Sequence, residues 1–153
     1  MSNGSSGIGR ILGGLGSMLG LGGGTIDPDR QMVLEVLFGL LGYLAKLDSL
    51  ITSHEADYIN QLMDEMKLSM KEREIASTSA QRGKNREIDV KAELSRYRQR
   101  YPYGTQECEK LYAALVELAA ADDRLRPKER QFLETVTVEL GYELKDLDAR
   151  LAD

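Results

Sequence analysis

Residues 44–55 read LAKLDSLITSHE, and residues 118–129 read LAAADDRLRPKE, 74 positions later. A leucine, an alanine, an aspartate and a glutamate occupy the same places in both copies. Apolar residues also match at helical spacing on both sides of the repeated segment. The repeat therefore predicts two similar helical hairpins, each with a short acidic turn between its two helices.

The residues that follow each turn are typical of helix starts. Thr52 and Glu55 have the spacing of a capping box, in which each side chain accepts the amide hydrogen of the other residue. In the second copy Pro127 suits the first helical position, where no amide hydrogen is needed. Glu129 then takes the third position, near the positive end of the helix dipole. We therefore expect both glutamates in the first turn of a helix.

Two roles are open for the carboxylates of Asp48, Glu55, Asp122 and Glu129. The aspartates can accept amide hydrogens within their turns, and the glutamates can cap the helices that follow. Alternatively, a pseudo-two-fold arrangement brings both turns together and offers four carboxylates to a divalent cation such as calcium. Each turn alone supplies too few oxygens, and neither has the central glycine of an EF-hand loop. We take capping as the interpretation and metal binding as its alternative.

Apolar periodicity and capping residues predict seven helices and no strand after the Gly-rich start. Asp27 is the expected cap of the first helix and Pro28 its first residue. The apolar surface of that helix is nearly continuous, which indicates a central buried helix. Ser69 and Glu72 form another capping box, and Gly83 is the expected end of the helix that it opens. The helices are expected at about 28–47, 53–67, 70–83, 89–100, 106–121, 127–140 and 144–151.

The composition narrows the classes of function. The formal net charge is −5 at pH 7, so non-specific binding to nucleic acid is not expected. Cys108 is the only cysteine, which excludes an internal disulfide and a cysteine-built zinc site and fits a reducing compartment. His54 is the only histidine, so few catalytic combinations exist. We therefore predict that the chain is not an enzyme and that Cys108 is a small core residue.

The middle of the chain is basic, since residues 67–100 hold ten basic and five acidic side chains. In the fourth helix Val90, Leu94, Tyr97 and Tyr101 follow core spacing, so the tyrosines are expected in the core and the arginines on a solvated face. We interpret this face as solvated or as a patch for an acidic partner, rather than as a nucleic-acid surface. Its residues are Arg82, Lys84, Arg86, Lys91, Arg96, Arg98 and Arg100.

Residues 1–26 carry ten of the fifteen glycines and form a separate Gly-rich segment. Between residues 8 and 26, apolar side chains fall on one helical face and glycines on another, with two GxxxG spacings that let helices approach closely in a bilayer. Three interpretations stay open: a flexible tail, a helix that associates with a membrane or with a second copy, and a helix packed on the domain. The folded domain is predicted to be residues 27–153.

The repeated pattern of an aspartate, an apolar residue three positions later and a glutamate seven positions later resembles the TerB fold of bacterial tellurite-resistance proteins. Residues 43–46, 61–66 and 83–84 further resemble the TerB-like N-terminal region of the membrane-anchored DjlA-type co-chaperones, in the same order and rough spacing. The resemblance covers about residues 31–151. It implies an all-α, TerB-like bundle of about seven helices built on a duplicated helical hairpin. It also implies that acidic residues bind metal, as in TerB proteins.

The resemblance implies a non-catalytic interaction module linked to stress response or co-chaperone regulation, with a protein as its partner. Membrane contact or self-association through residues 8–26 is a further expectation, and nucleic acid is not an expected partner. J-domain proteins use a His-Pro-Asp tripeptide, whereas His54 is followed by Glu55, so these 153 residues are not expected to form a complete J-domain protein. The alternative function is a metal-binding protein of tellurite or metal resistance. The expected location is the bacterial cytoplasm, with attachment to the inner membrane by the N-terminal segment as an option.

Overall fold

The computed structural model describes residues 27–47, 53–120 and 125–152, with side chains described from residue 57 in the second range. Within these ranges the chain forms seven helices and no strand, which confirms the predicted all-α fold class. The helices are α2 (Pro28–Ala45), α3 (Ser53–Glu65), α4 (Met70–Lys84), α5 (Val90–Arg100), α6 (Gln106–Ala119), α7 (Pro127–Leu140) and α8 (Leu144–Ala152).

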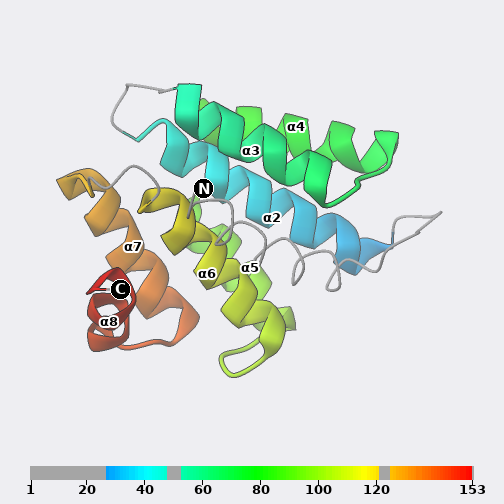
Figure 1. The fold of residues 1–153 in the computed structure, drawn as a ribbon. Coiled ribbons are helices and arrows are strands. Elements are labelled where there is room, and N and C mark those ends of the chain that lie inside the picture. The colour runs from blue at the N-terminus through cyan, green and yellow to red at the C-terminus, as the bar shows by residue number, and fades with distance from the viewer. Residues whose placement is uncertain (1–26, 48–52, 121–124, 153) are drawn as a thin grey trace.

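Helix α2 runs through the middle of the molecule (Figure 1). Helices α3 and α4 cover one side of it, and α5, α6, α7 and α8 lie on the other side. Every residue from 36 to 42 is buried, and seven consecutive residues cover the full circumference of a helix. The prediction that this helix is central and buried is therefore confirmed.

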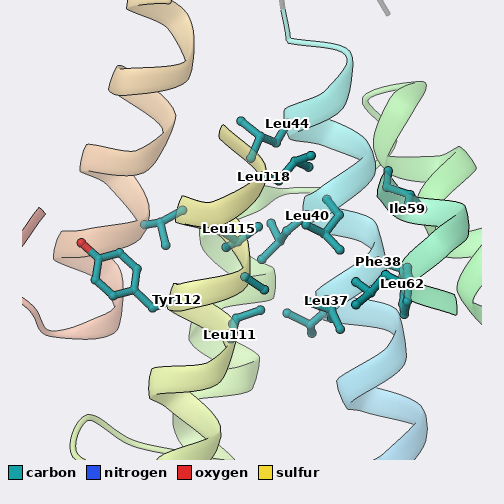
Figure 2. Packing of buried hydrophobic residues seen from close by; sticks show 14 of the residues in the cluster. Leu37, Phe38, Leu40, Leu44, Ile59, Leu62, Leu111, Tyr112, Leu115 and Leu118 are labelled. Carbon is teal, nitrogen blue, oxygen red and sulfur yellow. The ribbon is translucent and has the colours of Figure 1, made fainter. Parts of the chain in front are cut away.

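Both sides of α2 contribute to one hydrophobic core (Figure 2). On the α6 side, Leu40 lies beside Leu115 and Leu44 beside Leu118. On the α3 side, Phe38 lies close to Leu62. Positions that match between the two repeats are buried in both copies, as a duplicated hairpin requires. These matched pairs are Phe38 and Tyr112, Leu41 and Leu115, Ile59 and Leu133, Leu62 and Val136, and Met66 and Leu140.

Of all helix pairs, α2 and α4 pack against each other most extensively. The repeat did not indicate this pair, since it predicts that α2 pairs with α3. Two glycines make this close packing possible. A Cβ atom on Gly42 would lie 2.9 Å from the carbonyl carbon of Ala80 and still closer to its oxygen. A Cβ atom on Gly83 would lie 2.8 Å from the backbone nitrogen of Tyr43 and would overlap the carbonyl oxygen of Gly39. At each of these glycines the backbone of one helix therefore touches the backbone of the other.

The end of α4 differs from the prediction, because Gly83 lies inside the last helical turn and does not end the helix. The helix continues to Lys84, and Arg86 takes the left-handed conformation, with φ of 59°. The amide of Glu87 donates to the carbonyl of Arg82, and the amide of Arg86 donates to the carbonyl of Gly83. This pair of bonds is a Schellman motif in which an arginine occupies the place usually taken by glycine.

Most other helix ends follow the predicted capping chemistry. The carboxylate of Asp27 accepts from the Arg30 amide at 2.8 Å, and Ser69 and Glu72 form the predicted capping box. Helix α7 begins at Pro127 and ends at Leu140, where Gly141 caps it with φ of 96°. Three predicted C-termini extend two residues beyond the observed ones, which are Ala45, Glu65 and Ala119.

Candidate functional site

A surface groove of about 430 Å³ lies where the end of α2, the start of α5 and one face of α7 meet. We call it the α2–α5–α7 groove. Five of the residues that line it are apolar or aromatic, and we call them its apolar floor: Tyr43, Leu47, Ile88, Val90 and Phe132. The rings of Tyr43 and Phe132 stack with their centroids 5.6 Å apart, which joins α2 to α7 at the base of the groove. Tyr43, Ile88 and Val90 are only partly buried, so the floor has apolar surface open to a ligand.

Basic side chains surround this floor. Lys91 is on α5, Lys128 is on α7, and Arg86 comes from the turn after α4. The guanidinium of Arg86 lies over the Tyr43 ring, 5.8 Å from its centroid, and donates to the carbonyl oxygen of Leu47 at 3.1 Å. In the part of the chain that the structure describes, no ion pair involves Lys91 or Lys128.

Among the residues that the structure describes, one acidic residue, Asp89, also lines the groove. It is the N-cap of α5, and its carboxylate accepts from the Ala92 amide at 3.1 Å. The carboxylate therefore compensates the unpaired amides at the helix start, which leaves the basic residues in excess around the floor.

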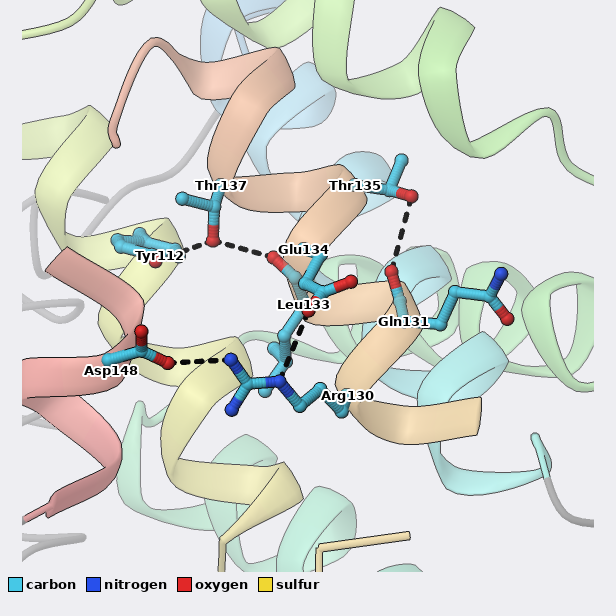
Figure 3. A network of polar contacts seen from close by, with 8 residues as sticks. All are labelled: Tyr112, Arg130, Gln131, Leu133, Glu134, Thr135, Thr137 and Asp148. Atoms are coloured by element: carbon cyan, nitrogen blue, oxygen red, sulfur yellow. Dashed lines mark hydrogen bonds and ion pairs between the residues drawn. The ribbon is translucent and has the colours of Figure 1, made fainter. Parts of the chain in front are cut away.

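The two faces of α7 have different partners (Figure 3). On one face, Arg130 contacts Asp148 of α8 at 2.6 Å and Glu134 at 3.1 Å. On the other face, Gln131 and Thr135 line the groove. The Thr135 hydroxyl donates to the backbone carbonyl of Gln131 at 3.2 Å. The side-chain amide of Gln131 makes no hydrogen bond with another described residue, so it can bond to a ligand at this surface.

A second depression of about 660 Å³ lies between the start of α6 and the turn before α8. Two of its polar side chains, Glu109 and Tyr142, are bonded within the molecule. The carboxylate of Glu109 accepts from the Tyr142 hydroxyl at 2.9 Å and from the Arg150 guanidinium at 2.7 Å. Burial first, and then the hydrogen bond to Glu109, raise the pKa of Tyr142 well above its ordinary value. This cluster therefore serves to attach α8 to α6.

Cys108 is fully buried in α6, which confirms its prediction as a core residue. Burial raises the pKa of its thiol above the ordinary value. A raised pKa disfavours the thiolate, which is the reactive form of cysteine. Cys108 is therefore a packing residue in this structure.

The family model described as "Tellurite resistance protein TerB" matches residues 27–151. The chain belongs to the TerB family. The resemblance stated from the acidic turns is therefore confirmed over nearly the whole length on which the seven helices lie.

The TerB domain is similar to curated proteins named "Co-chaperone protein DjlA". The relative from Shewanella oneidensis is 30% identical over 84% of this chain and 49% of its own length. The relatives from Aliivibrio fischeri and Mannheimia succiniciproducens are 27% and 25% identical, over 84% and 80% of this chain and 46% and 43% of their own lengths. The chain thus spans less than half the length of these relatives. No solved structure matches it at a significant level.

Of the four predicted metal ligands in the TerB domain, the structure places one side chain. Glu129 is buried at the third position of α7, and its carboxylate accepts from the Arg126 amide at 3.0 Å, as a cap does. Asp48, Asp122 and the side chain of Glu55 lie outside the described residues. Among the side chains that are described, no three of the metal-binding types come together. Capping by Asp48, Glu55 and Asp122 stays the prediction, and calcium binding at the acidic turns stays its alternative.

Membrane contact is one of the three interpretations of residues 8–26, which also lie outside the described part. Among the helices of the described part, none combines the length and apolar character needed to cross a bilayer. The capping box predicted for Thr52 and Glu55 falls outside the described side chains as well.

The groove includes only part of the predicted basic face. Arg86 and Lys91 line it, whereas Arg96 and Arg100 pair with Glu35 and Asp29 at 3.1 and 3.0 Å. Sequence reasoning missed the α7 contribution to the groove. The available signal was the spacing of Lys128, Gln131 and Thr135, which places three polar side chains on one helical face.

Proposed function

We propose that this TerB domain is a non-catalytic module that binds a protein partner through the α2–α5–α7 groove. The observation that carries the proposal is the groove itself, where an exposed apolar floor lies beside cations that form no ion pair among the described residues. Recognition sites commonly combine apolar surface with a few polar groups that fix orientation. The curated relatives support the proposal, because a co-chaperone acts together with another protein.

The setting proposed for this module is a stress response or the regulation of a chaperone, at the cytoplasmic side of the bacterial inner membrane. Residues 1–26 would then form a separate segment that contacts the membrane or a second copy, and residues 27–153 would form the binding domain. The GxxxG spacings between residues 8 and 26 support this division, since they suit helix association in a bilayer.

Position-specific photo-crosslinking in living cells tests the proposed site. A photoreactive amino acid at Gln131 would face the groove, whereas the same amino acid at Thr78 would lie on the exposed face of α4, on the other side of α2. We expect discrete adducts with another protein from position 131 and none of the same size from position 78.

Two outcomes would reject the proposal. Identical adduct patterns at both positions would mean that the groove has no special role. Adducts at position 131 that contain only a second copy of this chain would assign the groove to self-association instead of partner binding.

A further inference from the structure

We infer that the α2–α5–α7 groove binds an acidic peptide segment that carries one large apolar side chain. This inference rests on the proposed function, because it specifies the partner of the same site. It follows from the charges around the groove, from the size of its floor, and from the ion pairs that limit its basic surface.

The charges around the groove oppose those of the whole chain. The chain has a formal net charge of −5, yet among the described residues three cationic side chains and one carboxylate line the groove. Lysine and arginine offer only hydrogen-bond donors, so the ligand must supply acceptors. Lys91 and Lys128 approach from two different helices, which suits carboxylates spaced along a peptide.

The floor defines the second requirement of the ligand. The groove has a volume of about 430 Å³, which is in the lower part of the range for ligand sites, roughly 300–1,000 Å³. This space suits one large side chain and its neighbouring backbone rather than a folded surface. The stacked rings of Tyr43 and Phe132 present an aromatic base, which favours an apolar or aromatic side chain there. Gln131 can donate to and accept from the peptide backbone.

Nucleic acid fits the same surface less well. A phosphate backbone is recognised by a basic stripe that continues along the protein. Further along α5, however, Arg96 pairs with both Glu35 and Glu93, and Arg100 pairs with Asp29. The carboxylate partners of Arg96 and Arg100 therefore interrupt the basic surface along α5, which leaves a basic area at the groove on the scale of a short peptide.

Fluorescence anisotropy with the full chain and labelled peptides tests the inference. The first probe is a peptide of Glu and Asp with one central Trp, the second replaces that Trp with Ala, and the third keeps the Trp among Lys residues. We expect the full chain to bind only the first probe. Added salt should weaken this binding, because the attraction acts between exposed charges.

Charge reversal at the groove provides the matched variants. Lys91→Glu and Lys128→Glu should each weaken binding of the acidic Trp peptide about fivefold, which is the scale of one exposed ion pair. Lys71→Glu is the control, because it makes the same charge change at an exposed position in the first turn of α4, outside the groove. All three positions are exposed, so the variants should retain the helical circular dichroism of the wild type.

The inference is overturned if both groove variants bind the acidic Trp peptide as tightly as Lys71→Glu does. It is also overturned if the Ala peptide binds as well as the Trp peptide, or if single-stranded DNA displaces the peptide at a lower concentration than the unlabelled peptide does. If photo-crosslinking at position 131 gives adducts with another protein but the chain binds no acidic peptide, this inference is overturned and the proposed function stands. If neither adducts nor peptide binding are found, the inference and the proposed function are both overturned.

Discussion

Replacing Gly42 with alanine should destabilise the protein, although alanine is the better helix former. The added Cβ atom would lie 2.9 Å from the carbonyl carbon and 3.0 Å from the Cα atom of Ala80, and closer still to the carbonyl oxygen. These are backbone atoms within α4, so relief requires the helix itself to move. Side-chain rearrangement alone cannot remove the overlap.

The size of the effect follows from two opposing contributions. Overpacking a core typically destabilises a protein by about 1–3 kcal/mol. The cost of Gly42→Ala should be near the upper limit of this range, because the atoms that it meets belong to the backbone. Alanine in place of glycine stabilises a helix by about 1 kcal/mol through its higher helix propensity. The net loss in the free energy of unfolding should therefore be about 2 kcal/mol. For a domain of this size, that corresponds to a fall in melting temperature of roughly 8 °C.

Gly39→Ala is the matched control, one turn earlier in the same helix. A Cβ atom there would meet the Cδ1 atom of Ile88 at 3.6 Å and the carbonyl oxygen of Ser79 at 3.8 Å, which are ordinary contacts. This variant should gain about 0.5–1 kcal/mol from helix propensity. Urea titrations and thermal melts of the full chain measure both changes. The reasoning fails if Gly42→Ala is as stable as the wild type, or if both substitutions change stability in the same direction.

Three further predictions concern the core, the N-terminal segment and the acidic turns. Leu41→Ala and Leu115→Ala should each cost roughly 2–5 kcal/mol in urea titrations, because both side chains are fully buried at equivalent positions of the repeat; a loss under about 1 kcal/mol would contradict that equivalence. A fragment of residues 27–153 should fold and remain monomeric yet no longer float with liposomes, and flotation equal to that of the full chain would exclude a role for the segment it lacks. If the turns only cap helices, Asp48→Asn and Asp122→Asn should barely change the melting temperature with calcium or with chelator; a large calcium-dependent rise that both variants lose would establish metal binding instead.

The duplicated segment predicts the fold well because its information is periodic and local. Ile59, Leu62 and Met66 are buried, as are their counterparts 74 positions later, since each copy places the same helical face on the core. Capping residues act within three or four positions of the helix start, so Ser69 and Pro127 locate helix starts from sequence alone.

The contacts between distant segments were not predictable in the same way. Gly83 near a helix end normally indicates a C-terminal cap, and nothing within its neighbouring residues reveals that the backbone of α2 lies against it. The stack of Tyr43 on Phe132 joins residues from different repeats, so no local pattern indicates it. The groove was therefore absent from the prediction, although two of its cations, Arg86 and Lys91, were recognised as parts of a basic face.

The close packing of α2 on α4 also determines the shape of the groove. Gly83 lies against the backbone nitrogen of Tyr43, whose ring forms part of the floor. Three residues later the Schellman turn directs Arg86 back over that same ring and onto the carbonyl of Leu47. A side chain at position 83 would separate these helices and move the guanidinium away from the ring. Helix packing and ligand recognition are thus coupled in this domain, because the glycine that allows the helices to touch also positions a cation at the groove.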